Sequence, residues 1–485
     1  MNGDYAAKGL VFEEALLWER GKKGRSAFSM PESDVPESPL PSKDLAGDGP
    51  DFPDLSELEV VRHYTRLSQW NYGVDSGMYP LGSCTMKYNP KLHEKLASLP
   101  GFAMGHPLLP ESLGQGALFL MYELQEMLKA VTGLDAVSLQ PAAGAQGELC
   151  GMMLFSAWFR AKGEKRDKIL IPDTAHGTNP ASAALCGMKP VPVPSGEDGI
   201  LHPENIRALM DEKTSGIMIT NPNTLGLFET HFREIADIVH EKGGLVYCDG
   251  ANMNAVLGYV NMERMGVDVV HLNLHKTFAT PHGGGGPGAG PVCVTEALAP
   301  FLPVPLIVKN GDAYVLDMER PDSIGKLHAF YGNFGVLLKA YAYIKSLGPD
   351  LKRVSELAVL NANYLRVCLK EFYEPAQDRI CMHECIFSDK GLKPFGISTL
   401  DVAKRLIDFG FHPPTVYFPL VVNGAMMIEP TETECVEELD RFVEAMIRIR
   451  KEAEENSDLL HEAPTRSRVR RLDETLAARK PKLTG

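Results

Sequence analysis

The chain has 485 residues, of which 44% are hydrophobic, and a formal net charge of −14. A chain of this length can bury a large core and would ordinarily divide into two or three domains. The negative charge argues against a general binder of nucleic acid or of an anionic membrane. Nine irregularly spaced cysteines indicate free thiols in a reducing compartment. Because no apolar stretch is long enough to span a bilayer and no signal-peptide pattern is present, we expect a cytoplasmic protein without membrane contact.

The N-terminal part contains the clearest non-globular segment, residues 27–53, which is rich in proline, serine and acidic residues. Proline is poorly tolerated in helices and central strands, so we expect an extended arm that lies on a surface, of this chain or of a partner. A helix over about residues 55–67 and a loop rich in turn formers over residues 79–90 are predicted to follow.

Strand and helix patterns alternate from residue 135 onward. Short apolar runs predict strands at residues 168–171, 191–193, 216–220, 245–248 and 267–272. Between them, Phe232, Ile235, Ala236 and Val239 have the spacing of one buried helix face. Such alternation predicts a mostly parallel, doubly wound sheet.

A second, smaller α+β domain is predicted after the sheet domain. Helical patterns at residues 349–373 and 434–455 surround strand-like residues 380–387 and 425–428. We therefore divide the chain into an N-terminal arm and helical segment (residues 1–110), a large α/β domain (111–340), a small α+β domain (341–463) and a basic tail (464–485).

Polar side chains follow four of the predicted parallel strands. His176 comes after the first, Asn223 and Thr224 after the third, and Asp249 and Lys276 each end a later strand. In an open parallel sheet, ligands bind beyond the carboxyl ends of the strands. We therefore expect these residues to share one site.

Lys276 and Asp249 suit one cofactor, pyridoxal 5'-phosphate. That cofactor needs an amine to hold its aldehyde as a Schiff base and an acid to keep its pyridine nitrogen protonated. Lys276 emerges from an apolar run, and desolvation makes an amine a better nucleophile. Asp249 could instead cap the next turn, but its place one strand–helix crossover before the lysine favours the pyridinium partner.

Other residues near these strand ends admit two interpretations. His176 is either an ordinary loop histidine or a side chain stacked on the cofactor ring. Asn223 and Thr224 either build a turn or bond the cofactor's phenolic oxygen. Two more residues are predicted to bind the cofactor: Ala251, which suits close packing beneath the ring, and His275, which precedes the lysine.

The cofactor's phosphate requires backbone amides. Gly144 and Ala145 lie in a turn of small residues that precedes the apolar run at residues 149–159. A turn of this kind either opens a helix whose N–H groups and positive end hold an anion, or simply begins a closely packed helix.

Two further motifs do not support other functions. Residues 283–288 match G-x-G-x-x-G but do not open a βαβ unit, so they are not a dinucleotide fingerprint. Cys381, His383 and Cys385 would share one face of a strand, yet no matching ligand pair accompanies them, and we predict a buried strand without a metal.

Several motifs together resemble the P-protein of the glycine cleavage system, and the resemblance extends from Phe12 to residues 469–473. They are residues 80–87, 249–254, 274–278, 281–288, 330–334 and 428–433. The length is similar to the C-terminal half of the single-chain form, which many prokaryotes make as a separate subunit 2. The resemblance implies a fold-type I pyridoxal-phosphate enzyme and a partner, P-protein subunit 1, in an α2β2 heterotetramer.

The resemblance also implies a reaction. Glycine displaces Lys276 from the cofactor, loses its carboxylate as CO2, and passes its aminomethyl group to the lipoyl arm of the H-protein. Residues 80–87 and 282–288 are candidates for the substrate and lipoyl channel, with Ser83 and His282 as the residues to substitute. Another enzyme of the same fold, such as an aminotransferase or a cysteine desulfurase, would share Asp249 and Lys276 but has no reason to contain residues 80–87.

Overall fold

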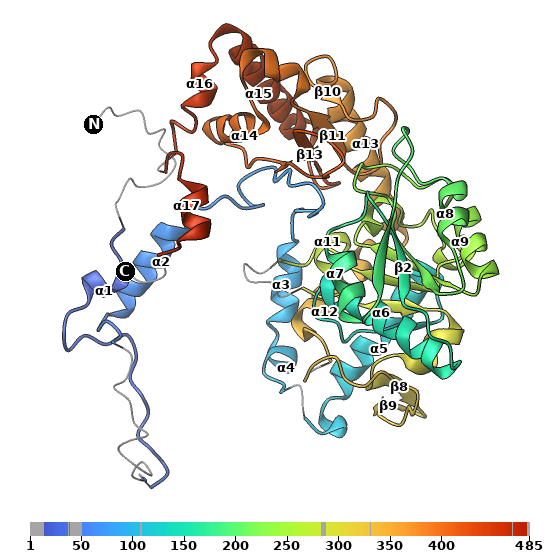
Figure 1. Cartoon of the computed structure of the whole chain (residues 1–485). Helices are drawn as coiled ribbons and strands as arrows, with labels where there is room; N and C mark the ends of the chain where they lie inside the picture. Colours follow the sequence, from blue (N-terminus) through green and yellow to red (C-terminus); the bar gives the residue numbers. More distant parts are fainter. Residues whose placement is uncertain are drawn as a thin grey trace. The chain divides into compact units, whose positions relative to one another are not determined.

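The computed structural model describes residues 14–36, 38, 51–106, 109–282, 288–329, 331–467 and 469–482. The chain forms two compact units, Met1–Ser76 and Gly77–Gly485. Figure 1 shows the elements of each unit. No helix in the described ranges is both long and apolar enough to cross a membrane.

The first unit contains two helices, α1 (Leu17–Arg20) and α2 (Glu57–Ser68). The helix α2 begins with a capping box in which the Ser56 side chain accepts from the Glu59 amide and Glu59 bonds back to Ser56. The helix expected over residues 55–67 is therefore present. The described proline-rich residues, 27–36, 38 and 51–53, contain no helix or strand.

The second unit is built around a seven-stranded sheet with the order β1-β7-β6-β5-β4-β2-β3. Strands β2 to β6 run parallel, whereas β7 pairs antiparallel with both β6 and β1. The strands are β1 (Ala136–Ser138), β2 (Lys168–Pro172), β3 (Lys189–Val193), β4 (Thr214–Thr220), β5 (Leu245–Gly250), β6 (Val269–Leu272) and β7 (Val292–Val294). The mostly parallel sheet predicted from the alternating pattern is confirmed.

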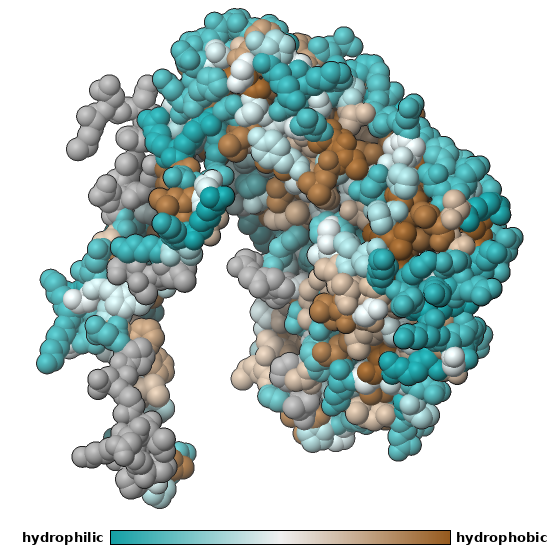
Figure 2. All heavy atoms as spheres, in the orientation of Figure 1, coloured by the Kyte–Doolittle hydropathy of each residue, from teal (hydrophilic) through white to brown (hydrophobic). Residues whose placement is uncertain are grey.

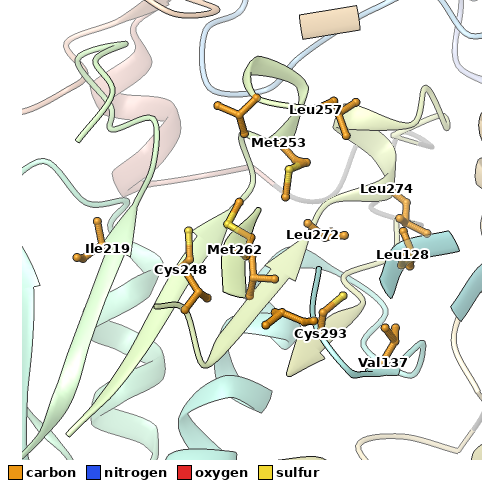
Figure 3. Packing of buried hydrophobic residues seen from close by; sticks show 14 of the residues in the cluster. Leu128, Val137, Ile219, Cys248, Met253, Leu257, Met262, Leu272, Leu274 and Cys293 are labelled. Carbon is orange, nitrogen blue, oxygen red and sulfur yellow. The ribbon is translucent and has the colours of Figure 1, made fainter. Parts of the chain in front are cut away.

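Helices pack against this sheet and bury its apolar side chains. They are α5 (Gln115–Thr132), α6 (Gly144–Ala161), α7 (Thr178–Leu185), α8 (Pro203–Leu209), α9 (Phe232–Glu241), α10 (Met262–Met265), α11 (Leu274–Thr277) and α12 (Phe334–Leu347). Figure 3 shows where strand and helix side chains meet, with Cys248 from β5, Leu272 from β6 and Leu128 from α5 in one cluster. Burial of such side chains supplies the main stabilisation of the unit.

A smaller antiparallel sheet, with the order β10-β11-β13-β12, follows in the chain. Its strands are β10 (Glu374–Pro375), β11 (Cys385–Ser388), β12 (Thr415–Val416) and β13 (Ala425–Ile428). Its helices are α13 (Arg353–Leu369), α14 (Thr399–Asp408), α15 (Val436–Glu455), α16 (Asp458–His461) and α17 (Glu474–Arg479). This arrangement agrees with the predicted α+β character.

Short elements complete the second unit. They are α3 (Lys91–Ala97), α4 (Pro100–Ala103), the hairpin β8 (Leu306–Asn310) and β9 (Ala313–Asp317), and the 3-10 helices η2 (Glu111–Leu113), η3 (Met253–Ala255), η4 (Glu296–Phe301), η5 (Gly348–Lys352) and η6 (Lys390–Phe395). Figure 2 shows hydrophilic side chains over most of the face that it draws, with hydrophobic side chains gathered in smaller areas.

Two predicted elements differ from the structure. Lys276 does not end a strand, because β6 stops at Leu272 and the lysine lies on the single-turn helix α11. Residues 380–384 of the predicted strand 380–387 are not a strand, since the Met382 amide donates to the carbonyl of Gly226 and Cys381 bonds the Asn363 side chain. Their backbone is therefore bound to other elements, and β11 begins only at Cys385.

Candidate active site

A cavity of about 180 Å³ lies beyond the carboxyl ends of β2, β4, β5 and β6. Eight of the predicted catalytic and cofactor-binding residues line it, as does Ser83, a predicted channel residue: Gly144, Ala145, His176, Thr224, Asp249, Ala251, His275 and Lys276. This is the place that the parallel-sheet rule indicates, because the strand ends deliver their side chains to one edge.

Lys276 reaches the cavity from α11. The chain leaves β6, passes Asn273 and turns once, so the lysine projects from a helix held by buried Leu274 and Thr277. The Lys276 Nζ donates a hydrogen bond of 2.7 Å to the carbonyl oxygen of Ser83, which lines the same cavity. The amine is therefore held at the edge of the cavity by a backbone carbonyl.

Asp249 projects from β5 and is 1% exposed. Its Oδ1 accepts from the Ala251 amide at 3.0 Å, and its Oδ2 lies 3.5 Å from the Thr220 hydroxyl. Oδ2 therefore has only a long contact and keeps capacity for a ligand donor. A buried carboxylate of this kind fits a protonated ring nitrogen.

His271 supports Asp249 from the neighbouring strand β6. Its Nε2 lies 3.5 Å from Asp249 Oδ1, and its Nδ1 bonds the Tyr247 hydroxyl. Burial lowers the pKa of His271 and raises that of Tyr247, so both stay neutral. When the phenol donates to Nδ1, the imidazole proton lies on Nε2 and faces the Asp249 carboxylate.

The helix α6 provides an anion site. It begins at Gly144 after the extended residue Ala143, and no side chain caps it, so its first backbone N–H groups are open at the cavity. A Cβ on Gly144 would lie 2.3 Å from the Asn273 Oδ1, so a larger residue here would require the Asn273 side chain to shift. An 18-residue helix with an open first turn suits a phosphate group.

His176 lies beyond β2, on the turn that leads into α7, and its side chain is exposed at the cavity. Its Nδ1 is 2.9 Å from the Thr178 hydroxyl, which is 2.8 and 2.7 Å from the two carboxylate oxygens of Glu148. Although the side chain is open to the cavity, the surrounding walls remove part of its hydration and thereby lower the pKa of His176, so its imidazole is neutral at pH 7.

His275 lies on α11, and its ring contacts residues that flank the glycine-rich segment on both sides. Its ring meets the ring of His282 edge to face at 5.2 Å, and its Nδ1 lies 3.4 Å from the amide of Ala289. Burial, with His282 and Lys276 nearby, lowers the pKa of His275 to about 3. The predicted glycine-rich turn at residues 283–287 lies outside the described residues.

Asn223 does not line the cavity, unlike Thr224. Its amide nitrogen donates to the Gly199 carbonyl and to Glu229, and its oxygen accepts from the amides of Leu225 and Leu227. The side chain is therefore occupied in building the turn, which was the other interpretation of this residue. Thr224 lines the cavity but donates to the carbonyl of Thr174 at 2.7 Å.

Two buried carboxyl groups hold the loop that carries Ser83. Glu384 accepts from the Ser83 amide at 2.8 Å, and Glu429 accepts from the Thr85 amide and hydroxyl at 3.0 and 2.6 Å. Ser83 and Thr85 have φ values of 65° and 49°, which non-glycine residues rarely adopt. Conformations of this kind persist where surrounding contacts over-determine them.

A third contact joins the same loop to the lysine-bearing helix. The Nζ of buried Lys87 donates to the carbonyl of Thr277 at 2.7 Å and pairs with Glu432 at 2.5 Å. Since Thr277 is the last residue of α11, the loop and this helix are fixed to each other.

His383 lies beside the two carboxyl groups. Atoms of His383, Glu384 and Glu429 that could bind a metal lie within 4.8 Å of one another, and no metal was predicted there. Among the described residues, neither ring nitrogen of His383 has a hydrogen-bond partner. Burial lowers the pKa of His383 to about 3, so its imidazole is neutral at pH 7, and burial raises the pKa of Glu384 well above its usual value.

Sequence reasoning missed several residues of the cavity: Glu148, Thr178, Thr220, Asn252 and Asn273. Thr220 ends β4 and Asn273 follows β6, so the strand-end rule applied to His176 and Asp249 would have found them. Glu148 lies one helical turn after Gly144, which puts it on the same face of α6.

Two families match parts of the chain. Residues 354–467 match the family described as glycine dehydrogenase, C-terminal domain, and residues 150–302 match aminotransferase class-V. The second range contains His176, Asp249 and Lys276.

Curated relatives match almost the whole chain. A probable glycine dehydrogenase (decarboxylating) subunit 2 of Halalkalibacterium halodurans is 55% identical over 97% of this chain and 97% of its own. The proteins of the same name from Caldanaerobacter subterraneus subsp. tengcongensis and Listeria innocua are 56% and 55% identical, over 96% of this chain and 98% and 97% of theirs.

Solved structures have the same fold. An inhibitor-bound glycine decarboxylase (P-protein) of the glycine cleavage system superposes with a TM-score of 0.72 at 21% identity, over 84% of this chain and 93% of its own. A cysteine desulfurase from Escherichia coli has a TM-score of 0.61 at 15% identity, over 78% of this chain and 95% of its own. With relatives above one-half identity across nearly its full length, the chain belongs to the family of glycine dehydrogenase (decarboxylating) subunit 2.

Proposed function

We propose that this chain decarboxylates glycine with pyridoxal 5'-phosphate and transfers the remaining aminomethyl group to the lipoyl arm of an H-protein. The observation that carries the proposal is the common cavity of Lys276 and Asp249, an amine and a buried carboxylate beyond the ends of adjacent parallel strands. The names of the relatives support the substrate.

The residues of the cavity fit this cofactor. Lys276 provides the attachment point for the aldehyde, Asp249 the acceptor for the protonated ring nitrogen, and the open first turn of α6 the phosphate site. His176 would stack on the ring, and Ala251 leaves room below it. When bound, the cofactor takes up the electrons that the departing carboxylate leaves behind.

The chain's own groups then have distinct tasks. The pair of His271 and Asp249 keeps a negative charge fixed beneath the cavity, away from water. The Ser83 carbonyl holds the Lys276 amine at the cavity edge, where the aldehyde of a bound cofactor would meet it. The carboxyl-held loop at residues 80–87, with Ser83 at its centre, and His282 beside His275 would form the channel for glycine and the lipoyl arm.

The partners are part of the proposal. The word "subunit 2" in the relatives' names supports a complex with subunit 1, and we propose an α2β2 heterotetramer that receives the lipoylated H-protein.

All nine cysteines are free, which supports a cytoplasmic location, because disulfides are rare in reducing compartments.

Two measurements test the function. Borohydride treatment of the chain with its cofactor should fix the cofactor on Lys276, which peptide mapping locates, and the complex with subunit 1 and H-protein should exchange labelled bicarbonate into glycine. Lys276→Ala should abolish both signals. Lys242→Ala, an exposed lysine at the end of α9, is the matched control.

Two outcomes would contradict the proposal. Cofactor fixed on another lysine would move the site elsewhere. Fixation on Lys276 without bicarbonate exchange would favour an aminotransferase or cysteine desulfurase reaction, which the fold also permits.

A further inference from the structure

Glu148 lies in the cavity but has no task in the proposed reaction. It projects from α6 one turn after the phosphate site and is 5% exposed. Both of its carboxyl oxygens contact the Thr178 hydroxyl, which also contacts the Nδ1 of His176. Glu148, Thr178 and His176 therefore form a continuous chain of hydrogen bonds.

The number of protons in this chain limits its states. A threonine hydroxyl has one proton to donate, and a neutral imidazole has one N–H and one acceptor nitrogen. The backbone amide of Thr178 also points at His176 Nδ1, at 3.3 Å. Each possible state is therefore defined by two choices: the partner to which the Thr178 hydroxyl donates, and the nitrogen of His176 that carries the proton.

The first state has Glu148 protonated. The carboxylic acid donates to the Thr178 hydroxyl, the hydroxyl donates to His176 Nδ1, and the Thr178 amide donates to Nδ1 as well. The imidazole proton then lies on Nε2. Every group along the chain has a partner of the correct kind.

The second state has Glu148 ionised. The Thr178 hydroxyl now donates its proton to the carboxylate. The hydroxyl oxygen can then only accept from His176, so the imidazole proton lies on Nδ1. The Thr178 amide then faces another N–H and loses its acceptor. His176 Nε2 becomes an acceptor.

The surroundings of Glu148 raise its pKa, so that the change between these two states occurs at a mildly alkaline pH. Burial first, then the charge of Asp249, raises the pKa of Glu148 to about 8, against the opposing effects of the Thr178 hydrogen bond and Lys276. Tyr247 from β5 also faces Glu148, and His271 from β6 lies against the adjacent Gly147. The folded protein therefore holds the acid form at neutral pH.

We propose that Glu148 is a positioning residue that sets the tautomer of His176 through Thr178. With the acid form present, His176 presents an Nε2–H donor, which suits an anionic group such as the carboxylate of an amino-acid substrate. When Glu148 loses its proton, the Nε2 of His176 becomes a hydrogen-bond acceptor instead. Only the suggestion that Nε2 contacts the substrate rests on the proposed function. The coupling between Glu148 and the His176 tautomer is a property of the chain without cofactor or substrate.

The tautomer can be measured directly. Solid-state 15N spectra of the full chain labelled at histidine distinguish the N–H nitrogen of a neutral imidazole from the acceptor nitrogen, and His176→Asn identifies the His176 signals. Between pH 6.5 and 9.5 we expect the N–H of His176 to move from Nε2 to Nδ1 with a midpoint near the Glu148 pKa.

Variants separate coupling from packing. Glu148→Gln, whose amide donates to Thr178 at every pH, should keep the Nε2–H tautomer throughout. Thr178→Val should uncouple the tautomer from Glu148, and Thr178→Ser, which keeps the hydroxyl, should restore the coupling.

Two results would overturn the inference. A His176 tautomer that does not change with pH in the unmodified chain would remove the coupling, and an unchanged transition in Glu148→Gln would assign it to another group. Neither result concerns cofactor fixation on Lys276, so the proposed function stands or falls separately.

Discussion

At the scale of single residues, the contacts of Asp249 decide what the cavity can do. One of its oxygens is bonded to the Ala251 amide, and the other has only the long contact to Thr220. The Nε2 of His271, on the strand β6 beside β5, lies 3.5 Å from the first of these oxygens. The carboxylate is thus buried, oriented and still able to accept from a ligand.

Asp249→Asn tests the role of this charge. An amide keeps the shape and can still accept from Ala251, but it cannot hold a proton on a ring nitrogen. A hydrogen bond to a charged group contributes about 1.5–3 kcal/mol, so bicarbonate exchange should fall by roughly 10- to 100-fold or more. Cofactor fixation on Lys276 should persist. Asp268→Asn, whose carboxylate bonds His240 and the Val246 amide, is the control, and a similar loss there would argue against a specific role.

At the scale of elements, the position of Lys276 depends on the loop that precedes α3. Lys87 joins that loop to the last carbonyl of α11, and Glu384 and Glu429 hold Ser83 and Thr85 in left-handed conformations. The reactive amine is therefore positioned by residues almost two hundred positions away in sequence.

Lys87→Met tests this connection. The side chains of Lys87 and Glu432 are 1% and 7% exposed, so removing the lysine leaves a buried carboxylate without its partner. Such a loss costs about 3–5 kcal/mol of unfolding free energy, which chemical denaturation measures. Lys95→Met, on the exposed face of α3, should change it little.

The double variant Lys87→Met with Glu432→Gln should recover part of the loss, because the uncompensated charge is gone. No recovery would show that Lys87 acts through its bonds to Thr277 and Tyr343 instead.

At the scale of the whole molecule, the first unit has features of a surface that another protein covers. On α2, Leu58, Val61 and Tyr64 are 55%, 55% and 57% exposed. Exposed apolar side chains grouped on one helix mark interaction sites more often than isolated ones do. This supports the proposed contact with subunit 1.

Val61→Asp should weaken the complex of the two subunits at least tenfold, because a charge would be buried in an apolar interface. Sedimentation of mixed subunits measures the change. Far-UV circular dichroism of the variant chain alone should match the unmodified chain, since Val61 is exposed on α2. An unchanged affinity would place the interface elsewhere.

Much of this protein could be predicted from its sequence, because its signals are local. Alternating apolar runs and helical spacing indicated the mostly parallel sheet, and motifs spread along the chain indicated the family; both are confirmed. The strand-end rule also selected Lys276, Asp249 and His176, whose roles stay predictions.

Only the tertiary structure decided which polar groups meet. Asn223 and Thr224 are adjacent in sequence, yet only Thr224 lines the cavity, because the amide of Asn223 is used within its own turn. Glu148, Thr178 and His176 join through contacts between α6 and the turn after β2. Hydrogen bonds between distant segments depend on how helices pack on the sheet, and no local pattern encodes that packing.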